Sequence, residues 1–458
     1  MGFKLKILLC LCLPLLIFCC GGNDKDPVTP EDPETPTITG DYILAAAVLN
    51  ISPSEISIDN NARMIEVALP RKFQKDSVRI KLTVNKGVTM EYPESEEAVY
   101  NLSKENQGVW LKAGNESIKF TMVSTVLTMP ESPVGKATIR DLVLIYDSYG
   151  THRPEWNETR FAPYLSLERE NGSHDWLFDG FLFIEFTDVN YDFCTGYGHN
   201  PARKTEWTKL VQHCLFRENL SAQALDNLIE KIKPKAPAAG LRKVVLTMPE
   251  PIKGQSDWGE VDGKTLSFLN DDDRITAAKW YIDYAISEYK AASFNNIQLA
   301  GFYWVSEAVG NSRTIVKTVA DYIHSKGLNF YWIPYFNADG YSQWADFGFD
   351  EAWLQPNYFF DTSVPLSRLD EACALANKYN MSNEFEFDAN ALWGGAKRQR
   401  MLDYIDAFKR NNVFRDKNIS YYEGGDGLYR LFHGTSEDLE LYRLFTEIIA
   451  ERQIRLKD

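Results

Sequence analysis

Carboxylate side chains recur at the ends of apolar, strand-like segments of this sequence. One such segment, residues 296–307, ends in Glu307. Another, with the sequence NEFEFD, alternates phenylalanine with three acids: Glu384, Glu386 and Asp388. Because successive side chains of a strand point to opposite faces, the phenylalanines are expected to pack outward and the three acids inward. Burial and like charge both raise a carboxyl pKa, so a fold tolerates such groups mainly where a site uses them.

Glu307 and Glu386 form the candidate catalytic pair. Two carboxyl groups that flank one bond can act as general acid and nucleophile, which is the chemistry of glycoside hydrolysis with retention. We expect Glu307 to protonate the leaving oxygen and Glu386 to attack the anomeric carbon. Glu384 lies deeper and is expected to be protonated or paired with an arginine, whereas Asp388 either lines the site or caps a loop.

The strand predicted for residues 296–307 is apolar on both faces, as is typical of parallel strands covered by helices. If Glu307 points to the interior, strict alternation places four further residues there: Leu299, Gly301, Tyr303 and Val305. Phe302 and Trp304 would then face an outer layer of helices.

Polar and aromatic residues near other strand ends are candidates for sugar recognition. Amide groups suit hydroxyl groups, and aromatic rings stack on the apolar faces of sugars. The predicted substrate-binding residues are Tyr303, Tyr335, Asn337, Gln355, Asn357, Trp258, Asp147 and Glu423. Further stacking positions are expected at Trp344 and Trp393, and at Trp304 if its ring does not face a helix.

From residue 137 to residue 458, apolar strands alternate with amphipathic helices. The expected strands are 141–147, 176–186, 243–249, 297–307, 329–336, 352–358, 383–387 and 419–423. The expected helices include 222–233, 274–291, 314–326, 365–379, 397–410 and 436–452. Eight strands with interposed helices predict an α/β fold, a (β/α)8 barrel, with an open doubly wound sheet as the alternative.

Residues 41–128 show a different pattern, with short alternating segments separated by turn residues. This predicts a small immunoglobulin-like β-sandwich, which precedes the barrel. No cluster of catalytic residue types stands out there, so a spacer is favoured over a glycan-binding module.

Residues 1–20 carry two lysines, a short apolar stretch and a cysteine pair. This segment resembles a bacterial lipoprotein signal, in which Cys20 would be acylated after cleavage. Residues 21–40 are rich in proline and acids and predict a disordered tether, whose start resembles a surface-export signal of Bacteroides-like lipoproteins. We therefore expect a protein anchored by lipid in the bacterial outer membrane and facing the cell exterior.

The net charge of −15 excludes a nucleic-acid partner, which would require a basic surface. The six histidines are scattered, so a histidine-based zinc site is not expected, and the leading hypothesis needs no cofactor. The remaining alternative for metal chemistry is a carboxylate site on Asp147, Glu185 and Asp188. The cysteines after residue 20 predict buried thiols with at most one disulfide, and a monomer is expected.

Several sequence strings together carry a family resemblance: GFYWVSE, FYWIPYFNADGY, WLQPNYFF and EFEFD. The chain from about Arg140 onward resembles a domain-of-unknown-function family of secreted bacterial proteins grouped with glycoside hydrolase barrels. A second similarity is to the large clan of retaining glycosidases with the acid/base on strand four and the nucleophile on strand seven. Glu307 and Glu386 occupy those places, but Ser306 stands where that clan has asparagine.

Two functions from different classes follow. The leading hypothesis is a surface-anchored glycoside hydrolase that acts on an oligo- or polysaccharide. The alternative is a glycan-binding lipoprotein that keeps the barrel without catalysis.

Overall fold

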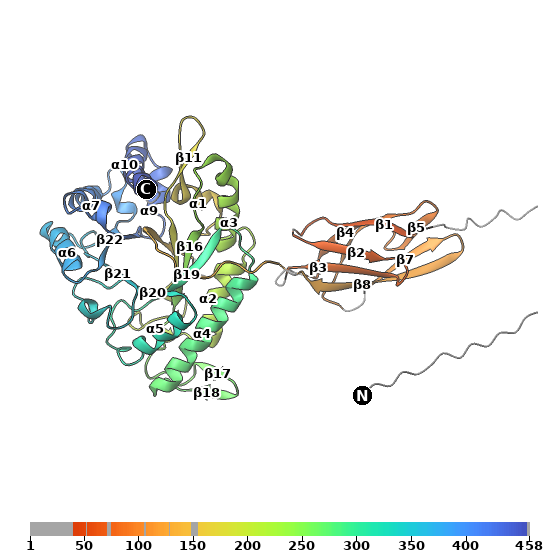
Figure 1. Ribbon diagram of the computed structural model, residues 1–458, viewed down its shortest axis with the longest axis horizontal. Coiled ribbons are helices and arrows are strands. Elements are labelled where there is room, and N and C mark those ends of the chain that lie inside the picture. The colour runs from red at the N-terminus through yellow and green to blue at the C-terminus, as the bar shows by residue number, and fades with distance from the viewer. Residues whose placement is uncertain are drawn as a thin grey trace, which may run out of the picture. The chain divides into compact units, whose positions relative to one another are not determined.

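The computed structural model describes residues 40–51, 53–70, 75–104, 107–127, 129–147 and 154–455. The chain divides into two compact units between Leu127 and Thr128 (Figure 1). The predictions for the signal segment, Cys20 and most of the tether lie outside the described residues. Within those ranges, no helix combines the length and the apolar character needed to cross a membrane.

The N-terminal unit consists of two sheets that share one apolar core. The smaller sheet has the strand order β1 (Ile43–Val48), β4 (Val78–Val84), β6 (Glu97–Tyr100). The larger sheet has the order β2 (Glu55–Asp59), β3 (Met64–Leu69), β8 (Glu116–Val126), β7 (Gln107–Ala113), β5 (Val88–Tyr92). In β3 and β4 buried and more exposed side chains alternate, which gives each sheet one apolar face. Buried side chains from both sheets form a single cluster, so the unit is a β-sandwich.

The C-terminal unit is a closed barrel of eight parallel strands, which confirms the predicted (β/α)8 fold (Figure 1). In chain order the strands are β9 (Asp141–Tyr146), β12 (Gly180–Ile184), β16 (Arg242–Met248), β19 (Ile297–Trp304), β20 (Asn329–Trp332), β21 (Glu351–Leu354), β22 (Ser382–Glu386) and β23 (Ile419–Tyr422). Each of the eight expected strands is present, and β9 pairs with both β12 and β23 to close the ring. An open sheet is thereby excluded.

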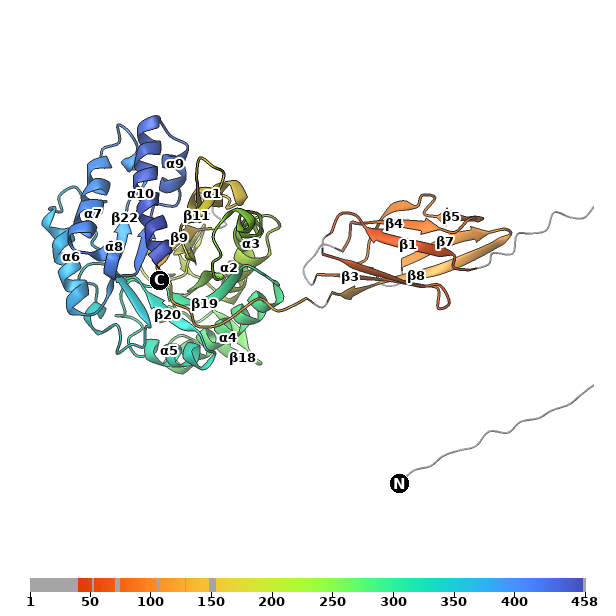
Figure 2. The ribbon, with the colours of Figure 1, turned by 45° about the horizontal axis from the view of Figure 1, so that its top comes forward.

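Helices surround the barrel strands (Figure 2). They are α1 (Glu158–Leu165), α2 (Lys204–Phe216), α3 (Ser221–Ile232), α4 (Asp271–Ala291), α5 (Val316–Ser325), α6 (Ser367–Lys378), α7 (Arg398–Arg410), α8 (Val413–Asp416), α9 (Gly427–Phe432) and α10 (Ser436–Arg455). In α4 the Asn270 side chain caps the first turn by accepting from Asp273 N, and the buried face includes Tyr281, Ala285 and Tyr289. The large cluster between strands and helices therefore follows from the predicted helical spacing.

A β-bulge in β19 changes the expected alternation. Val244 of β16 lies opposite Leu299, but Val245 lies opposite Gly301, so Ala300 is an extra residue. The prediction that Leu299 points inward is therefore wrong, since Leu299 packs in the outer cluster. Ala300 takes its place in the interior, where Tyr303 and Val305 also lie as expected.

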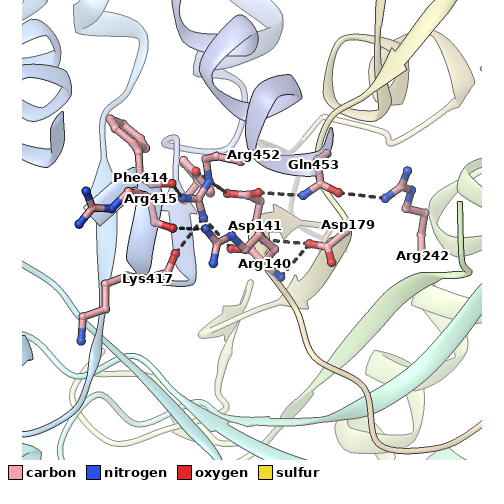
Figure 3. Close-up of polar contacts among 10 residues, drawn as sticks. Arg140, Asp141, Asp179, Arg242, Phe414, Arg415, Lys417, Arg452 and Gln453 are labelled. Atoms are coloured by element: carbon pink, nitrogen blue, oxygen red, sulfur yellow. Dashed lines mark hydrogen bonds and ion pairs between the residues drawn. The ribbon is translucent and has the colours of Figure 1, made fainter. Parts of the chain in front are cut away.

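At the amino ends of the strands, a buried ion pair joins the last helix to the first strand (Figure 3). Arg452 Nε of α10 donates to Asp141 Oδ1 at 2.7 Å, and both side chains are buried. Asp141 also accepts from Gln453 Nε2 at 2.8 Å and from the Tyr421 hydroxyl at 2.7 Å. Arg452 Nη2 donates to the backbone oxygen of Lys417 at 3.0 Å, and Nη1 donates to that of Phe414. The pair thus fixes α10 where the barrel ring closes.

The segment before the first barrel strand packs against the barrel. Leu299 N donates to Pro133 O, and Gly135 N donates to Leu299 O, each at 3.0 Å. The Ser132 hydroxyl accepts from Phe294 N at 2.7 Å. Residues 129–136 lie between the two predicted domains, and Val134 in this segment forms a parallel bridge with β19.

Candidate active site

A pocket of about 280 Å³ opens where the barrel strands end. Three glutamates line it: Glu307, Glu384 and Glu386. The remaining lining residues are Leu144, Tyr146, Ile184, Phe186, Thr187, Tyr197, Tyr303, Ile333, Gln355, Asn357, Phe360 and Tyr422. They come from or follow β9, β12, β19, β20, β21, β22 and β23, which is the carboxyl-terminal face where (β/α)8 enzymes carry their active sites.

Glu307 follows the end of β19 and is held by an amide network from the neighbouring loops. Gln355 Nε2 donates to Glu307 Oε1 at 2.7 Å and to Ile333 O at 3.0 Å. Asn357 Nδ2 donates in turn to Gln355 Oε1 at 3.0 Å, which fixes the orientation of the Gln355 amide. Burial raises the pKa of Glu307, and the bond from Gln355 opposes this by stabilising the carboxylate.

Glu386 is the last residue of β22 and is almost fully buried. The hydroxyl group of Tyr404, from α7, donates to Glu386 Oε2. Backbone N–H groups of Asn357 and Tyr358 also bond to this carboxylate. Burial raises the pKa of Glu386 to about 7, although these three donors act to lower it.

Glu384 lies two residues earlier on β22, which alternation places deeper in the barrel on the same side. Its carboxyl accepts a hydrogen bond from the Ser420 hydroxyl at 3.3 Å. Burial, followed by the charges of Glu386 and Glu307, raises the pKa of Glu384 well above its usual value. Because the charges of Glu384 and Glu386 oppose one another, these two carboxyl groups lose their protons as a coupled pair.

Five aromatic rings that line the pocket contact one another in a series, which we call the collar. Their contacts run from Tyr197 to Phe186 (5.5 Å between centroids), Phe186 to Tyr146 (6.3 Å), Tyr146 to Tyr422 (5.7 Å) and Tyr422 to Phe360 (5.4 Å). The two ends of this collar are the exposed ones, with Tyr197 47% and Phe360 39% accessible. Such rings can stack on the apolar faces of a sugar that enters the pocket.

Residues 141–447, more than half of the chain, match the family described as Domain of unknown function (DUF4855). The chain belongs to this family. No curated protein matches it.

Solved structures similar to the DUF4855 chain are distant. One, from Bacteroides thetaiotaomicron and described provisionally as a glycoside hydrolase, has 17% identity and a TM-score of 0.17, with 32% of this chain and 36% of that chain covered. A DUF4623 family protein from Bacteroides eggerthii has 13% identity and a TM-score of 0.16, with 23% and 30% covered. The aligned part thus spans about a third of the lengths of these two proteins. A family 18 chitinase from Crocus vernus has 14% identity and a TM-score of 0.35, with 66% and 98% covered.

Five of the predicted site residues meet in the pocket of this DUF4855 barrel: Glu307, Glu386, Tyr303, Gln355 and Asn357. The prediction missed all five residues of the collar and Tyr404. Tyr146 and Tyr422 end their strands, so alternation could have identified them. Tyr197 and Phe360 lie in loops, and Tyr404 reaches the site from a helix, where the sequence carries no such signal.

Two predicted residues of the loop after β20 do not line the pocket. The side chain of Tyr335 is 40% exposed and lies outside it. Asn337 is also exposed and adopts a positive φ of 62°, so it serves the turn. The reason is that β20 ends at Trp332, earlier than expected, and alternation no longer applies beyond it.

Three further predicted residues do not line the pocket and contact the surrounding helices or outer cluster instead. Trp258 is buried in the outer cluster against Trp207, at 5.1 Å between ring centroids. Asp147 faces α2, where it pairs with His213 at 3.5 Å. Glu423 accepts from the Tyr164 hydroxyl at 2.9 Å and from Leu428 N at 3.0 Å, so it caps α9. On strand eight the inward position belongs to Tyr422 instead.

The remaining aromatic and acidic candidates also lie outside the pocket. Asp388 caps the short turn after β22 by accepting from Asn390 N at 2.7 Å, which is the loop-cap alternative. The rings of Trp304 and Trp344 pack in the outer cluster. Trp393 is 59% exposed and contacts the Arg398 guanidinium at 5.5 Å.

The carboxylate metal site has no support in the geometry. Asp147 and Glu185 line a separate small cavity beside α2, and Asp188 belongs to the short strand β13 (Thr187–Asp188). Among the residues that the structure describes, no group of three or more metal-ligating side chains comes together.

Proposed function

We propose that this protein is a glycoside hydrolase that cleaves O-glycosidic bonds with retention of configuration. The observation that supports this most directly is that Glu307, after β19, and Glu386, at the end of β22, line one pocket at the carboxyl-terminal face although β20 and β21 lie between their strands. The collar of aromatic rings around that pocket suits a carbohydrate ligand. Retention is the finer part of the proposal, and its support is the resemblance in strand position of Glu307 and Glu386 to the acid/base and the nucleophile of retaining glycosidases. The different surroundings of the two carboxyl groups support the assignment of their roles.

Glu386 is assigned the nucleophile. A nucleophile must be ionised, and its three hydrogen-bond donors, the Tyr404 hydroxyl and two backbone N–H groups, stabilise the carboxylate. In the first step a Glu386 oxygen attacks the anomeric carbon, and the glycosidic C–O bond breaks. The product is a glycosyl ester of Glu386.

Glu307 is assigned the general acid and base. It has one side-chain donor, Gln355, and its burial favours the protonated form that an acid needs. Its proton passes to the leaving oxygen in the first step. In the second step the resulting carboxylate takes a proton from water, the water oxygen attacks the anomeric carbon, and Glu386 is released.

The test is the release of reducing ends from a panel of purified polysaccharides and oligosaccharides. The protein is expected to cleave at least one of them, and Glu307→Gln should lower turnover about 10²–10⁴-fold. The Glu386→Gln variant should lose on the order of 10³-fold or more. Glu351→Gln is the matched control, because Glu351 is a largely buried glutamate at the opposite end of β21, and it should retain activity. Binding of glycans without cleavage would instead support a non-catalytic glycan-binding protein.

We further propose that the protein acts outside the cell, anchored in the outer membrane through lipid on Cys20. The support is the sequence of the first 40 residues, in which a short apolar stretch, the cysteine and an acidic, proline-rich segment follow one another. Polysaccharides that do not enter the cell would then be accessible to the barrel.

A further inference from the structure

The described residues that line the pocket supply carboxyl groups and no cationic side chain to balance them. Among the described residues that line it, three are glutamates and none is lysine, arginine or histidine. The charges that bear on Glu384 are those of Glu386 and Glu307, both of the same sign. A ligand that brings a further negative charge would therefore meet repulsion without compensation.

The side-chain amide groups of the pocket already donate hydrogen bonds within the protein. Gln355 donates to Glu307 and to Ile333 O, and Asn357 donates to Gln355. Proteins hold carboxylate, sulfate or phosphate groups mainly with charged donors or with several free N–H groups. The described side chains that line the pocket include no charged donor and no group of several free N–H donors, so their remaining polar groups are mainly hydroxyl and carboxyl groups.

We propose that the pocket accepts a sugar ring without a carboxylate, sulfate or phosphate group, and that Glu384 binds a hydroxyl group of that ring. This inference rests on the proposed function and names its class of substrate. The volume of about 280 Å³ is large enough for one sugar ring with its hydroxyl groups.

Glu384 has the position and the hydrogen-bonding capacity for this role. It lies deep in the pocket, and the hydrogen bond found for its carboxyl comes from the Ser420 hydroxyl at a long 3.3 Å. Burial, followed by the neighbouring charges of Glu386 and Glu307, raises the pKa of Glu384 well above its usual value, which favours the protonated form. A protonated carboxyl both donates and accepts, which matches a sugar hydroxyl and does not add a negative charge.

The first experiment is saturation-transfer NMR on the unmodified protein. The neutral probes are glucose, galactose, mannose, xylose and N-acetylglucosamine, and the anionic probes are glucuronate and galacturonate. We expect at least one neutral sugar to bind, and no uronate to bind at a tenfold higher concentration. A uronate that binds as well as the neutral sugars would overturn the proposal, and so would a failure of all neutral sugars to bind. If a neutral sugar binds and no glycan is cleaved, the hydrolase proposal fails while this one stands.

The second experiment tests Glu384 itself. Glu384→Met keeps the size of the side chain and removes its polar atoms, so the affinity for the bound sugar should fall at least tenfold. With a cleaved substrate, the loss should appear mainly in KM and less in kcat. Glu351→Met, at the opposite end of the barrel, is the control and should leave the affinity unchanged. An unchanged affinity in Glu384→Met, with an unchanged unfolding midpoint, would overturn the assignment of Glu384.

Discussion

Gln355 Nε2 lies 2.7 Å from Glu307 Oε1, so an amide from the loop after β21 donates directly to the carboxyl group that follows β19. This bond stabilises the ionised form of Glu307 and opposes the effect of burial on its pKa. The pKa of the proposed acid is therefore lowered by Gln355, a residue that takes no part in proton transfer. Its removal gives a direct test of which carboxyl group is the acid.

In Gln355→Leu the pKa of Glu307 should rise, by about one unit if the bond contributes about 1.4 kcal/mol. A general acid must be protonated, so activity falls as pH rises through its pKa. The alkaline limb of kcat/KM should consequently move to higher pH, while the acidic limb moves less. A pH–rate profile measures both limbs. A shift of the acidic limb alone would assign the acid role to Glu386 instead.

Tyr404 offers the complementary test on the nucleophile. Burial raises the pKa of Glu386 to about 7, and the Tyr404 hydroxyl, which donates to Glu386 Oε2, opposes that rise. In Tyr404→Phe that pKa should rise by about one unit. Because the nucleophile must be ionised, activity appears as pH rises through this pKa, and the acidic limb should move to higher pH. The matched control is Tyr358→Phe. The Tyr358 hydroxyl donates to Asp403 outside the pocket at 2.7 Å, so its removal should leave the pH–rate profile unchanged.

The buried ion pair between Arg452 and Asp141 should be essential for the stability of the barrel. Arg452→Met leaves a buried carboxylate without its charge partner, which costs about 3–5 kcal/mol in the free energy of unfolding. Urea denaturation followed by tryptophan fluorescence measures this, because every tryptophan except Trp110 lies in the barrel unit.

A control for the buried ion pair lies on the same helix, α10. Arg455 is half-exposed and pairs with Glu451 at 3.5 Å, so Arg455→Met should cost less than about 1 kcal/mol. Equal losses of unfolding free energy in Arg452→Met and Arg455→Met would mean that the buried ion pair stabilises the barrel no more than the exposed one.

The sequence was sufficient to predict the barrel because the signals for its strands are local. Apolar runs and helical spacing are properties of neighbouring residues, and the eight strands lie where these runs occur. The same holds for Glu384 and Glu386, since β22 is regular and its alternation with phenylalanine places both acids inside.

Features that depend on the rest of the fold could not be predicted in this way. The bulge at Ala300 arises from the register between β19 and β16, and it turned Leu299 outward. Trp258 has the composition of a sugar-stacking residue, yet its ring completes an outer cluster with Trp207. Tyr404 reaches Glu386 only because α7 packs beside β22, a long-range relationship that no local pattern encodes.

Attachment to the membrane is a separate prediction. If Cys20 carries the lipid, Cys20→Ala should release the protein from the outer-membrane fraction. Fractionation followed by immunoblotting measures this, and protease treatment of intact cells tests exposure on the exterior. A Cys20→Ala variant that stays membrane-bound would mean that Cys19 carries the lipid or that the protein is no lipoprotein.

The stereochemical course of hydrolysis decides the roles of the two catalytic glutamates. Retention follows from two successive displacements at the anomeric carbon, the first by Glu386 and the second by water. Proton NMR of the first-formed sugar should therefore show the anomer of the substrate. An inverted anomer would remove Glu386 from the nucleophile role and would require a water between the carboxyl groups.

Azide separates the two roles further, with an aryl glycoside of the accepted sugar as substrate. In Glu386→Ala the vacated space admits azide, which attacks the anomeric carbon directly and should give a glycosyl azide of inverted configuration. In Glu307→Ala the glycosyl ester of Glu386 still forms, because a good leaving group needs little protonation, and azide should then give the retained product. The two variants thus predict opposite anomers from the same reagents. A glycosyl azide of retained configuration from Glu386→Ala would mean that the glycosyl ester still forms in this variant. Glu307 would then be the nucleophile and Glu386 the general acid and base.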